Sequence, residues 1–523
     1  MVFPDAIGGY MARRGARKAG AQIDGPRKLL DGQLAWQNPR YIDKATEPLS
    51  ADQIQAIHEA SLDVLEQIGI RFLNETALDY LQTAGCDIDR SDMNVKMDRH
   101  WVMEMIGHAP SSFSVTPRNP DKQIIIGDGY FNFGQVSSPP NILDSETGRR
   151  MGTRADFCNF LHLSQAFNCI HAIAGYPVEP MDLHASVRHL YATLDMLVYS
   201  DKVIHGYSLG KERIEDVMEM TRIAAGLSHT EFDASPHIFT NINSSSPLKH
   251  DYPMLDGAMR LARRNQPVVI TPFTLSGAMA PVTIVGAIVQ QNAEALAAIA
   301  LLQFINKGTP VVYGAFTSNV DMKTGAPAFG TPEYIRAMQI SGQMAKFYNV
   351  PLRTSNANAA NVPDGQSIWE SAFSLQGALS GHSNLIYHAA GWLEGGLSAS
   401  PEKFVMDCEM LQQVIYTQQP LEFSPDALGV EAIKEVGPDG HFFGCEHTKK
   451  RYKTAYYSPF LSDWSNYESW QEAGKVWTHE RAFNAYKRIL EEHQPPAIDP
   501  AIKEELEAFV ARRVEEGGAP TDF

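Results

Sequence analysis

Short apolar runs alternate with longer amphipathic stretches through most of this chain. Eight runs rich in β-branched and aromatic residues predict strands, at 130–136, 169–174, 202–207, 237–242, 267–272, 310–315, 351–356 and 384–389. Stretches with a helical spacing of apolar residues lie between them, at 184–199, 211–225, 252–264, 283–306, 332–348, 366–380 and 402–417. Such alternation is typical of a parallel sheet assembled from βα units.

Eight βα units predict an α/β fold of the (β/α)8 TIM-barrel type, here over residues 121–420. A doubly wound open sheet is the structural alternative, but it usually has fewer strands and a phosphate-binding loop. Neither GxGxxG nor GxxxxGK followed by Ser or Thr occurs in the chain. The missing loop motifs therefore favour the barrel.

The segments before and after the predicted barrel have patterns of their own. Apolar residues spaced three to five apart predict a helix from about residue 50 that ends at Gly69, and a second helix follows at 75–83. We therefore expect an N-terminal helical layer at 50–120, preceded by a flexible arm at 1–49. Beyond residue 420 the chain is rich in proline, aromatic and charged residues. This composition predicts an extension at 421–523 that wraps the barrel and ends in a solvated helix at 501–516.

Composition narrows the range of functions and locations. The formal net charge of −17 argues against a nucleic-acid partner, which needs a basic surface to displace counterions. The five cysteines are scattered and form no CxxC pair, so a disulfide framework or zinc ribbon is not predicted and a reducing cytoplasm fits best. The N-terminal segment lacks the apolar run of a secretory signal. The most apolar stretch, 284–305, contains Gln290, Gln291, Asn292 and Glu294, which predicts a buried helix rather than a membrane span.

Candidate functional residues are sought at the C-terminal ends of the predicted strands, where TIM-barrel enzymes place their sites. These positions are rich in aromatic and amide side chains, and they show neither a convergent pair of carboxylates nor metal-ligand spacing. A neutral, aromatic mouth suits a methylated ammonium, because ring faces attract a cation that has no N–H to donate. Several of the rings could equally pack the rim of the barrel. The candidate substrate-binding residues are Phe133, Tyr176, Tyr207, Phe273, Tyr313, Phe316, Arg353, Asn356, His388, Trp392 and Glu394.

Two local motifs allow other interpretations. Residues 206–210 fit GxSxG between a predicted strand and a helix, which would make Ser208 the nucleophile of a hydrolase. No HGGG-like oxyanion segment accompanies it, and the strand comes early for the hydrolase order. In the second motif His441, Cys445 and His447 could bind a metal, although a loop folding over the barrel is the more ordinary explanation.

Several segments together resemble the trimethylamine methyltransferase family. They are 276–283 (SGAMAPVT), 290–294 (QQNAE), 308–314, 330–333 (GTPE), 363–366 (PDGQ), 440–444 (GHFFG) with His447 and Thr448, and 461–463 (LSD). The similarity runs from about residue 50 to 495. The whole collection is more specific than any one motif.

The resemblance implies a TIM barrel that transfers a methyl group to a small corrinoid protein whose cobalt, in the Co(I) state, attacks an N-methyl carbon. Founding members of the family carry pyrrolysine in the barrel, whereas this chain contains only the twenty standard residues. It therefore resembles the branch without pyrrolysine, for which glycine betaine and related quaternary amines are the implied substrates. The corrinoid is expected on the partner protein, with no cofactor tightly bound to this chain, and a homo-oligomer is expected.

The implied chemistry needs few catalytic groups, and no catalytic residue is assigned. A quaternary ammonium leaves as a neutral amine without taking a proton, so the protein must mainly orient the methyl group and exclude water. Ring contacts should contribute about 0.5–2 kcal/mol each, because positive charge leaves the nitrogen in the transition state. A substrate carboxylate would meet Arg353, His388, Asn356 or Asn358, although Arg353 fits a buried structural role equally well. The alternative functions are a serine hydrolase and a non-catalytic protein that binds quaternary amines.

Overall fold

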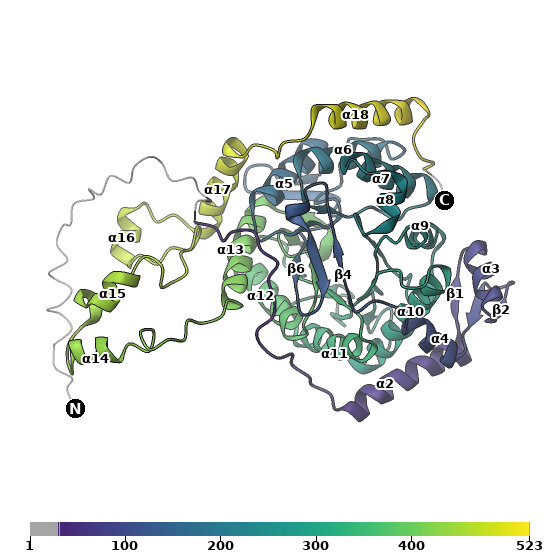
Figure 1. The fold of residues 1–523 in the computed structure, drawn as a ribbon, viewed down its shortest axis with the longest axis horizontal. Coiled ribbons are helices and arrows are strands. Elements are labelled where there is room, and N and C mark those ends of the chain that lie inside the picture. The colour runs from purple at the N-terminus through teal and green to yellow at the C-terminus, as the bar shows by residue number, and fades with distance from the viewer. Residues whose placement is uncertain (1–29, 31, 522–523) are drawn as a thin grey trace.

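The computed structural model describes residue 30 and residues 32–521, which form a mixed α/β fold around eight short parallel strands (Figure 1). The strands are β6 (Asn132–Phe133), β9 (Ala172–Ile173), β10 (Val203–Ile204), β11 (Thr240–Ile242), β13 (Val268–Ile270), β15 (Val311–Gly314), β18 (Leu352–Ser355) and β19 (Leu385–Tyr387). Six of them pair in the order β11-β13-β15-β18-β19-β6, and β10 pairs with β9. Isolated parallel bridges join Gly134 to Ala172 and His205 to Phe239. Each edge of the two-stranded pair therefore lies beside one edge of the six-stranded sheet.

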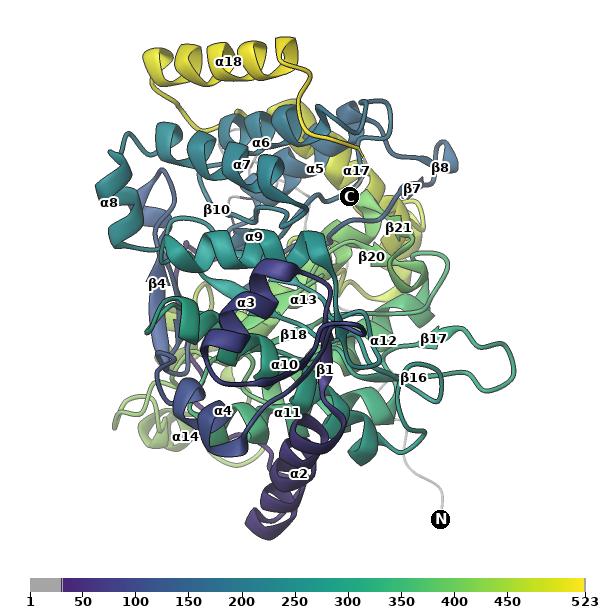
Figure 2. The ribbon, with the colours of Figure 1, turned by 90° about the vertical axis from the view of Figure 1, so that its right-hand side faces the viewer.

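A helix follows each of these strands along the chain, and helices surround the strands in both views (Figures 1 and 2). The helices are α5 (Arg154–Ala166), α6 (Arg188–Tyr199), α7 (Lys211–Ala224), α9 (Tyr252–Arg263), α10 (Ile284–Ile305), α11 (Pro332–Tyr348), α12 (Gly365–Ser380) and α13 (Pro401–Thr417), with α8 (His229–Ala234) between α7 and β11. Every predicted strand contains one observed strand, and the α/β class is confirmed. Helix α5 was not among the predicted helices.

Buried apolar side chains form two layers because successive residues of a strand point to opposite faces. The smaller layer lies on the inner side of the strands and includes Val203, Val269, Val312 and Leu385. The hairpin of β4 (Ser112–Val115) and β5 (Ile124–Gly127) packs against it. The larger layer lies between the strands and the helices.

Side-chain caps fix where the helices begin after their strands. Thr331 accepts a hydrogen bond from the Tyr334 N–H and precedes Pro332 at the start of α11. Asp364 accepts from two backbone N–H groups at the start of α12. A cap of this kind contributes about 1 kcal/mol and sets the length of the loop before it. The strand-to-helix loops that carry the site are therefore anchored at their helical ends.

Helix α10 is the one helix in the described part of the chain that is long and apolar enough to cross a membrane, yet 72% of its most apolar window is buried inside the protein. Its polar residues are buried as well and bond to neighbouring elements. Gln291 donates to the Ser341 hydroxyl at 3.0 Å, and Asn292 donates to the Tyr348 hydroxyl at 2.8 Å. The sequence-based interpretation of this stretch as a buried helix agrees with its position.

The N-terminal region before the strands combines helices with a small sheet. Helices α2 (Ala51–Asp63), α3 (Glu75–Thr83) and α4 (Arg99–Ile106) pack on α10. The α2 helix continues through a π-helical turn, Val64–Ile68, to Gly69, whose φ of 85° ends it. The strands β1 (Ile70–Phe72), β2 (Asp87–Asp89), β3 (Asn94–Lys96) and β12 (Lys249–His250) form a four-stranded sheet in the order β12-β1-β3-β2, which the helical pattern did not predict. Residues 1–29 and 31 of the predicted arm lie outside the described residues.

The C-terminal extension has two parts. Helix α17 (Thr478–Glu492) packs on α13 and α5, and α18 (Pro500–Glu515) packs on α6 and α7. Between α13 and α17, the helices α14 (Val430–Val436), α15 (Glu446–Arg451) and α16 (Tyr467–Glu472) project away from the strands (Figure 1). Glu409 of α13 holds the return of this segment by accepting hydrogen bonds from the Phe460 and Leu461 N–H groups at 3.1 and 3.0 Å.

Candidate functional site

A cavity of about 200 Å³ lies at the C-terminal ends of the parallel strands. Its size suits a small organic molecule, since sites for drug-sized ligands occupy about 300–1,000 Å³. Its walls carry neither aspartate nor glutamate. The lining residues are Ser137, Ser138, His205, Tyr207, Ser208, Leu209, Asn241, Asn243, Met254, Phe316, Arg353, Tyr387, His388 and Trp392.

Arg353, on β18, brings a positive charge into this cavity. The residue is 2% exposed, and its Nε and Nη1 have no hydrogen-bond partner among the described residues. Its guanidinium carbon lies 4.3 Å from the centre of the Tyr387 ring and 5.4 Å from that of Phe316. Burial lowers the pKa of Arg353 to about 10, so the side chain stays charged at neutral pH. A buried cation that lacks an anion in the protein is an incomplete anion-binding site.

Aromatic rings form the wall next to Arg353. His388 and Trp392 lie with ring centroids 3.9 Å apart, and Phe316 lies 5.8 and 6.4 Å from them. The Trp392 Nε1–H donates to the Asn358 carbonyl at 3.1 Å, while the Asn358 amide donates to the Trp392 carbonyl at 2.7 Å. This reciprocal pair fixes the orientation of the indole ring, which is the ring type that attracts cations most strongly.

The histidines in the cavity are neutral. The His205 Nε2 accepts a hydrogen bond from the Asn241 N–H at 3.1 Å, so its Nδ1–H donates to the Ala174 carbonyl at 3.1 Å. Burial lowers the pKa of His205 to about 4. Burial also lowers the pKa of His388 well below its ordinary value, and the charge of Arg353 adds to this effect. Neither imidazole is therefore set up to exchange a proton near neutral pH.

Two tyrosines complete the polar side of the cavity. The Tyr207 hydroxyl accepts a hydrogen bond from the Tyr176 N–H at 3.1 Å and bonds to Ser137 and Ser138. Burial raises the pKa of Tyr207 to about 12 and raises that of Tyr387 further. The Tyr387 hydroxyl is buried and has no partner among the described residues. It is therefore a free donor next to the unpaired guanidinium.

Five of the residues predicted from the strand ends line this cavity together, namely Tyr207, Phe316, Arg353, His388 and Trp392. Two more lie directly behind its walls. The ring of Tyr176 lies 4.4 Å from that of Tyr207, and the ring of Phe273 lies 5.0 Å from that of Phe316. The prediction of an aromatic mouth with few acids matches these walls.

The structure places the four other predicted residues elsewhere. Phe133 and Tyr313 lie in the apolar layer between strands and helices, and the Tyr313 hydroxyl donates to Asn292 on α10 at 3.1 Å. Asn356 uses its amide to bind the Ala389 carbonyl at 3.0 Å. Glu394 forms an ion pair with Arg149 at 3.0 Å on the rim.

Other lining residues were not among the predicted site residues, above all Tyr387 and the pair Ser137 and Ser138. The signal for Tyr387 was the alternation along β19, because Leu385 and Tyr387 face the inner layer together. The two serines follow β6 in a turn where Ser138 has a φ of 64°. No periodic pattern marks such a turn.

Neither alternative motif gains support from the geometry. The Ser208 hydroxyl donates to the Met254 carbonyl at 2.8 Å, and both nitrogens of nearby His205 are engaged with the backbone, so Ser208 has no base to activate it. The Cys445 Sγ lies 3.3 Å from the Thr448 hydroxyl. Within residue 30 and residues 32–521, no three His, Cys, Asp or Glu side chains lie close enough to hold a metal ion.

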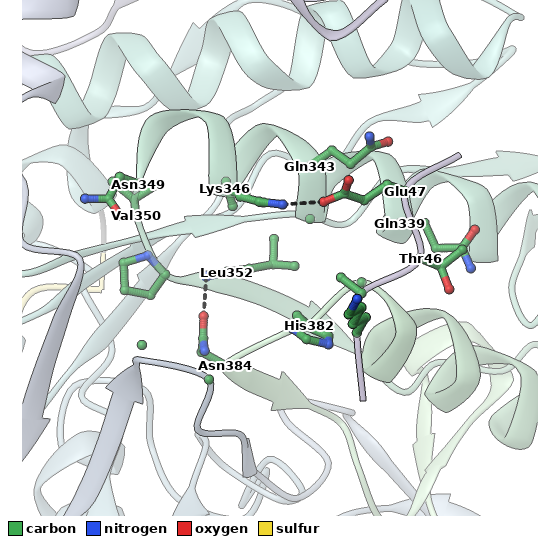
Figure 3. Close-up of a pocket in the computed structure, with 18 of the residues that line it drawn as sticks. Thr46, Glu47, Gln339, Gln343, Lys346, Asn349, Val350, Leu352, His382 and Asn384 are labelled. Atoms are coloured by element: carbon green, nitrogen blue, oxygen red, sulfur yellow. Dashed lines mark hydrogen bonds and ion pairs between the residues drawn. The ribbon is translucent and has the colours of Figure 1, made fainter. Parts of the chain in front are cut away.

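A larger cavity of about 550 Å³ lies at the opposite, N-terminal ends of the strands, between residues 43–47, α11 and the turn at His382 (Figure 3). Two of its charged groups pair with each other, Lys346 with Glu47 at 2.5 Å, and its residues Asp43 and Lys44 are exposed to solvent. Asn384 accepts a hydrogen bond from the Leu352 N–H at 3.0 Å. Because its charged groups are paired or exposed to solvent, this cavity presents no buried, unpaired charge comparable to Arg353 among the described residues, and we assign the candidate site to the smaller cavity.

Comparisons with known proteins give a consistent result. A family model described as trimethylamine methyltransferase (MTTB) matches residues 12–518. The chain is 36% identical over 471 residues to the glycine betaine methyltransferase of Desulfitobacterium hafniense strain Y51, covering 90% of this chain and 98% of that protein. It is 31% identical over 477 residues to the trimethylamine methyltransferase MttB of D. hafniense strain DSM 10664 / DCB-2, covering 90% and 94%. It is 28% identical over 428 residues to the proline betaine:corrinoid methyltransferase of Eubacterium limosum, covering 80% and 87%.

Proposed function

Because the chain belongs to the trimethylamine methyltransferase family, we propose that it demethylates a quaternary amine that carries a carboxylate, with glycine betaine as the first candidate. The enzyme moves the methyl group to the corrinoid of a partner protein, in line with the names of its relatives. The observation that carries the choice of substrate is Arg353, a buried guanidinium that forms no ion pair within the described part of the chain. A carboxylate on the ligand would complete its hydrogen bonds.

We propose that the ligand extends across two parts of the cavity. Arg353, with the free Tyr387 hydroxyl, would hold the carboxylate, while Trp392, Phe316 and the His388 ring would surround the methylated nitrogen. Because the ring faces bind a cation without needing an N–H, they accept a nitrogen on which every position is a carbon. Holding both ends of the molecule fixes the direction in which one N-methyl group points.

None of the histidines and tyrosines that line the cavity is set to release a proton near neutral pH, which fits this reaction. The cavity contains neutral histidines and tyrosines whose pKa values burial raises. A quaternary ammonium departs as a neutral amine when its methyl group is taken, so no acid is required. The work of these residues is to bind, to orient and to keep water away from the methyl group.

The corrinoid is proposed to remain on its partner protein. Bound there, it supplies the Co(I) nucleophile that accepts the methyl group. A cavity of about 200 Å³ has room for the small substrate but not for a corrin ring, which supports our proposal that this chain holds no corrinoid of its own. The ring would then approach from outside, over the C-terminal ends of the strands.

The proposal also covers the closure of the barrel, the oligomeric state and the cellular location. We propose that the six-stranded sheet and the β9–β10 pair close into one (β/α)8 barrel, supported by the bridges from Gly134 to Ala172 and from His205 to Phe239. We propose a homo-oligomer, supported by exposed apolar side chains on the projecting segment, which we define as residues 418–477 between α13 and α17. Leu421 and Phe423 in this segment are 92% and 87% exposed. A cytoplasmic location, free of membrane and nucleic acid, remains our prediction.

The test is incubation of the purified protein with free cob(I)alamin and glycine betaine, followed by the absorbance change that accompanies methylation of cob(I)alamin. We expect transfer from glycine betaine and much slower transfer from choline, which has the same cationic head but no carboxylate. Equal rates with choline would contradict the role of Arg353. No transfer from any of a panel of N-methylated amines would contradict the proposed reaction.

A further inference from the structure

The loops around the cavity carry a set of exposed apolar side chains that the substrate site does not use. They come from the segments that follow β6, β13, β15, β18 and β19, which are neighbours in the order of the strands. All of them lie in loops or hairpins except Val285, which is in the first turn of α10. We call this set the mouth rim. It consists of Met151 (59% exposed), Val282 (69%), Val285 (46%), Met322 (71%), Val362 (48%) and Leu397 (54%).

The mouth rim is distributed over elements that lie on one side of the molecule. The hairpin of β7 (Asn141–Asp144) and β8 (Gly148–Met151), the strands β20 (Trp392–Leu393) and β21 (Ser398–Ala399), and the hairpin of β16 (Ser318–Val320) and β17 (Pro327–Ala328) lie along one edge in Figure 2. β21 pairs with both β20 and β7. Segments far apart in the sequence therefore build one continuous face.

Direct contacts connect this face to the walls of the cavity. Trp392 lies on β20, and a methyl group at Gly396 would come within 2.6 Å of its indole, so the backbone next to Leu397 lies against a cavity wall. Phe316 stacks on Phe329 at 5.5 Å, beside the hairpin that carries Met322. The segments that carry the mouth rim are therefore in contact with the residues that form the cavity walls.

Two rim residues on different loops also share one surface patch. β14 (Leu275–Ser276) pairs with β16, which brings the loop before α10 beside the hairpin after β15. A methyl group at Gly277 would lie 3.1 Å from the Met322 Sδ and 3.8 Å from the Val282 Cγ2. These side chains are therefore neighbours in space although 40 residues separate them in the chain.

We propose that the mouth rim is the surface on which the corrinoid carrier protein docks, an inference that rests on the proposed function. The cavity holds the methyl group and is too small for the corrin ring, so the carrier must meet this chain where the cavity opens. Tyr207, Asn241 and Asn243 line the cavity and remain partly exposed, so water reaches it until a partner covers it. An apolar rim sealed by the carrier would exclude that water.

The types of side chain in the rim fit a large and partly apolar occupant. Aliphatic residues and methionines dominate it, and methionine adapts its shape to a surface that must bind and release repeatedly. The loops after β9 and β10 carry no large apolar side chain with comparable exposure among the described residues. The loop after β9 is instead covered by the C-terminal tail, where the Ala519 N–H donates to the Ser186 carbonyl at 2.8 Å. The carrier would therefore approach from the side of β6 and the strands from β13 to β19.

The test uses two methyl acceptors with the same set of variants. The first acceptor, free cob(I)alamin, needs no docking surface. The second is a corrinoid-binding protein from the same genome, reconstituted with cobalamin and active with the wild-type enzyme, and it does need a docking surface. The rim variants are Met322→Glu and Leu397→Glu, with Met322→Leu as the conservative form. The controls are Ile68→Glu, at a position 58% exposed on the N-terminal region, and Leu421→Glu, on the projecting segment.

We expect the two glutamate rim variants to raise KM for the carrier protein at least tenfold and to stay within about twofold of wild type with free cob(I)alamin. Met322→Leu, Ile68→Glu and Leu421→Glu should match wild type with both acceptors. Glutamate rim variants with a wild-type KM for the carrier would overturn the proposal. A loss of methyl transfer to the carrier that is confined to Leu421→Glu would also overturn it, because docking would then lie on the projecting segment. If methyl transfer to free cob(I)alamin fails, the proposed function fails with it, but the rim can still be tested by measuring carrier binding with biolayer interferometry in the absence of substrate. Weaker binding by the glutamate rim variants alone would support docking at the mouth rim. Unchanged binding by these variants would overturn it.

Discussion

Replacing Arg353 by methionine should change stability and activity in opposite directions. The side chain is 2% exposed, and two of its nitrogens have no partner among the described residues, so the free enzyme bears the cost of an uncompensated charge. Burial lowers the pKa of Arg353 to about 10, which at about 1.4 kcal/mol per pKa unit corresponds to about 3 kcal/mol against the charged form at neutral pH. Methionine fills much of the same space without that charge. We expect the variant to be more stable by about 1–3 kcal/mol.

The same substitution should remove most of the activity with glycine betaine. Losing one partner of a buried charge pair costs about 3–5 kcal/mol, which corresponds to a fall in kcat/KM of about 100-fold to more than 1,000-fold. Arg353→Lys keeps a charge but loses the planar fork that binds both oxygens of a carboxylate, so an intermediate loss is expected. Choline lacks the carboxylate and should lose little in either variant.

Differential scanning calorimetry and initial rates with free cob(I)alamin test both expectations. Glycine betaine should raise the Tm of the wild-type protein and leave that of Arg353→Met unchanged, because the ligand can stabilise only a protein that binds it. The pH dependence provides a further check. Because the pKa of Arg353 is lowered on folding, its cost is present below pH 10 and is relieved as the pH rises above that value, so the advantage of the methionine variant should shrink there. A variant that is less stable and still fully active would refute the assignment of Arg353 as an anion site.

Three further predictions concern the aromatic rings, the pH dependence of the reaction and the loop that Glu294 anchors. Trp392→Ala and Phe316→Ala should each raise KM for glycine betaine by up to about thirtyfold, the equivalent of about 2 kcal/mol. KM values equal to that of the wild-type enzyme in steady-state assays would argue against a ring cage. With free cob(I)alamin, kcat/KM should be independent of pH from about pH 6 to 9, because the pKa values of His205, Arg353 and Tyr207 are about 4, 10 and 12. A bell-shaped pH profile would instead reveal a required proton transfer. Glu294→Ala should lower the free energy of unfolding by about 3–5 kcal/mol in urea titrations. The reason is that the carboxylate accepts hydrogen bonds from Ser246, the Leu248 N–H and Gln290. An unchanged urea midpoint of unfolding would contradict this anchoring role.

The order of strands and helices could be read from the sequence because each element lies between two apolar layers or against one of them. Continuous apolar runs such as 310–315 mark strands buried on both faces, and the structure has β15 there. Helix α10 was equally visible, because even its polar residues are buried in the middle of an apolar stretch. The strands β1, β2 and β3 of the small N-terminal sheet escaped prediction because their sequences, IRF, DID and NVK, alternate polar with single apolar residues and contain no apolar run.

The direction of each side chain was harder to predict than the strand that carries it. Tyr313 and Phe316 are only three residues apart, yet Tyr313 bonds to α10 while Phe316 lines the cavity. A strand of two to four residues does not reveal its inward face, because a shift of one residue reverses every side chain. The candidates beyond the strand ends, such as Trp392, depended instead on loop geometry. The sequence therefore predicted the end of the strands at which the cavity lies and the aromatic character of its walls, but only some of the residues that line it.

The segments that carry the family resemblance act mainly on the loops around the cavity. Thr331 and Asp364 cap the helices after β15 and β18. Glu294 fastens the loop after β11, and Leu461 is bonded to Glu409 of α13. None of these four residues lines the cavity. The family signature therefore specifies the loops that hold the cavity, while our proposal assigns the choice of amine to the inward residues, Arg353 foremost. Substrate choice can accordingly change by substitution within the cavity while the segments that identify the family stay as they are.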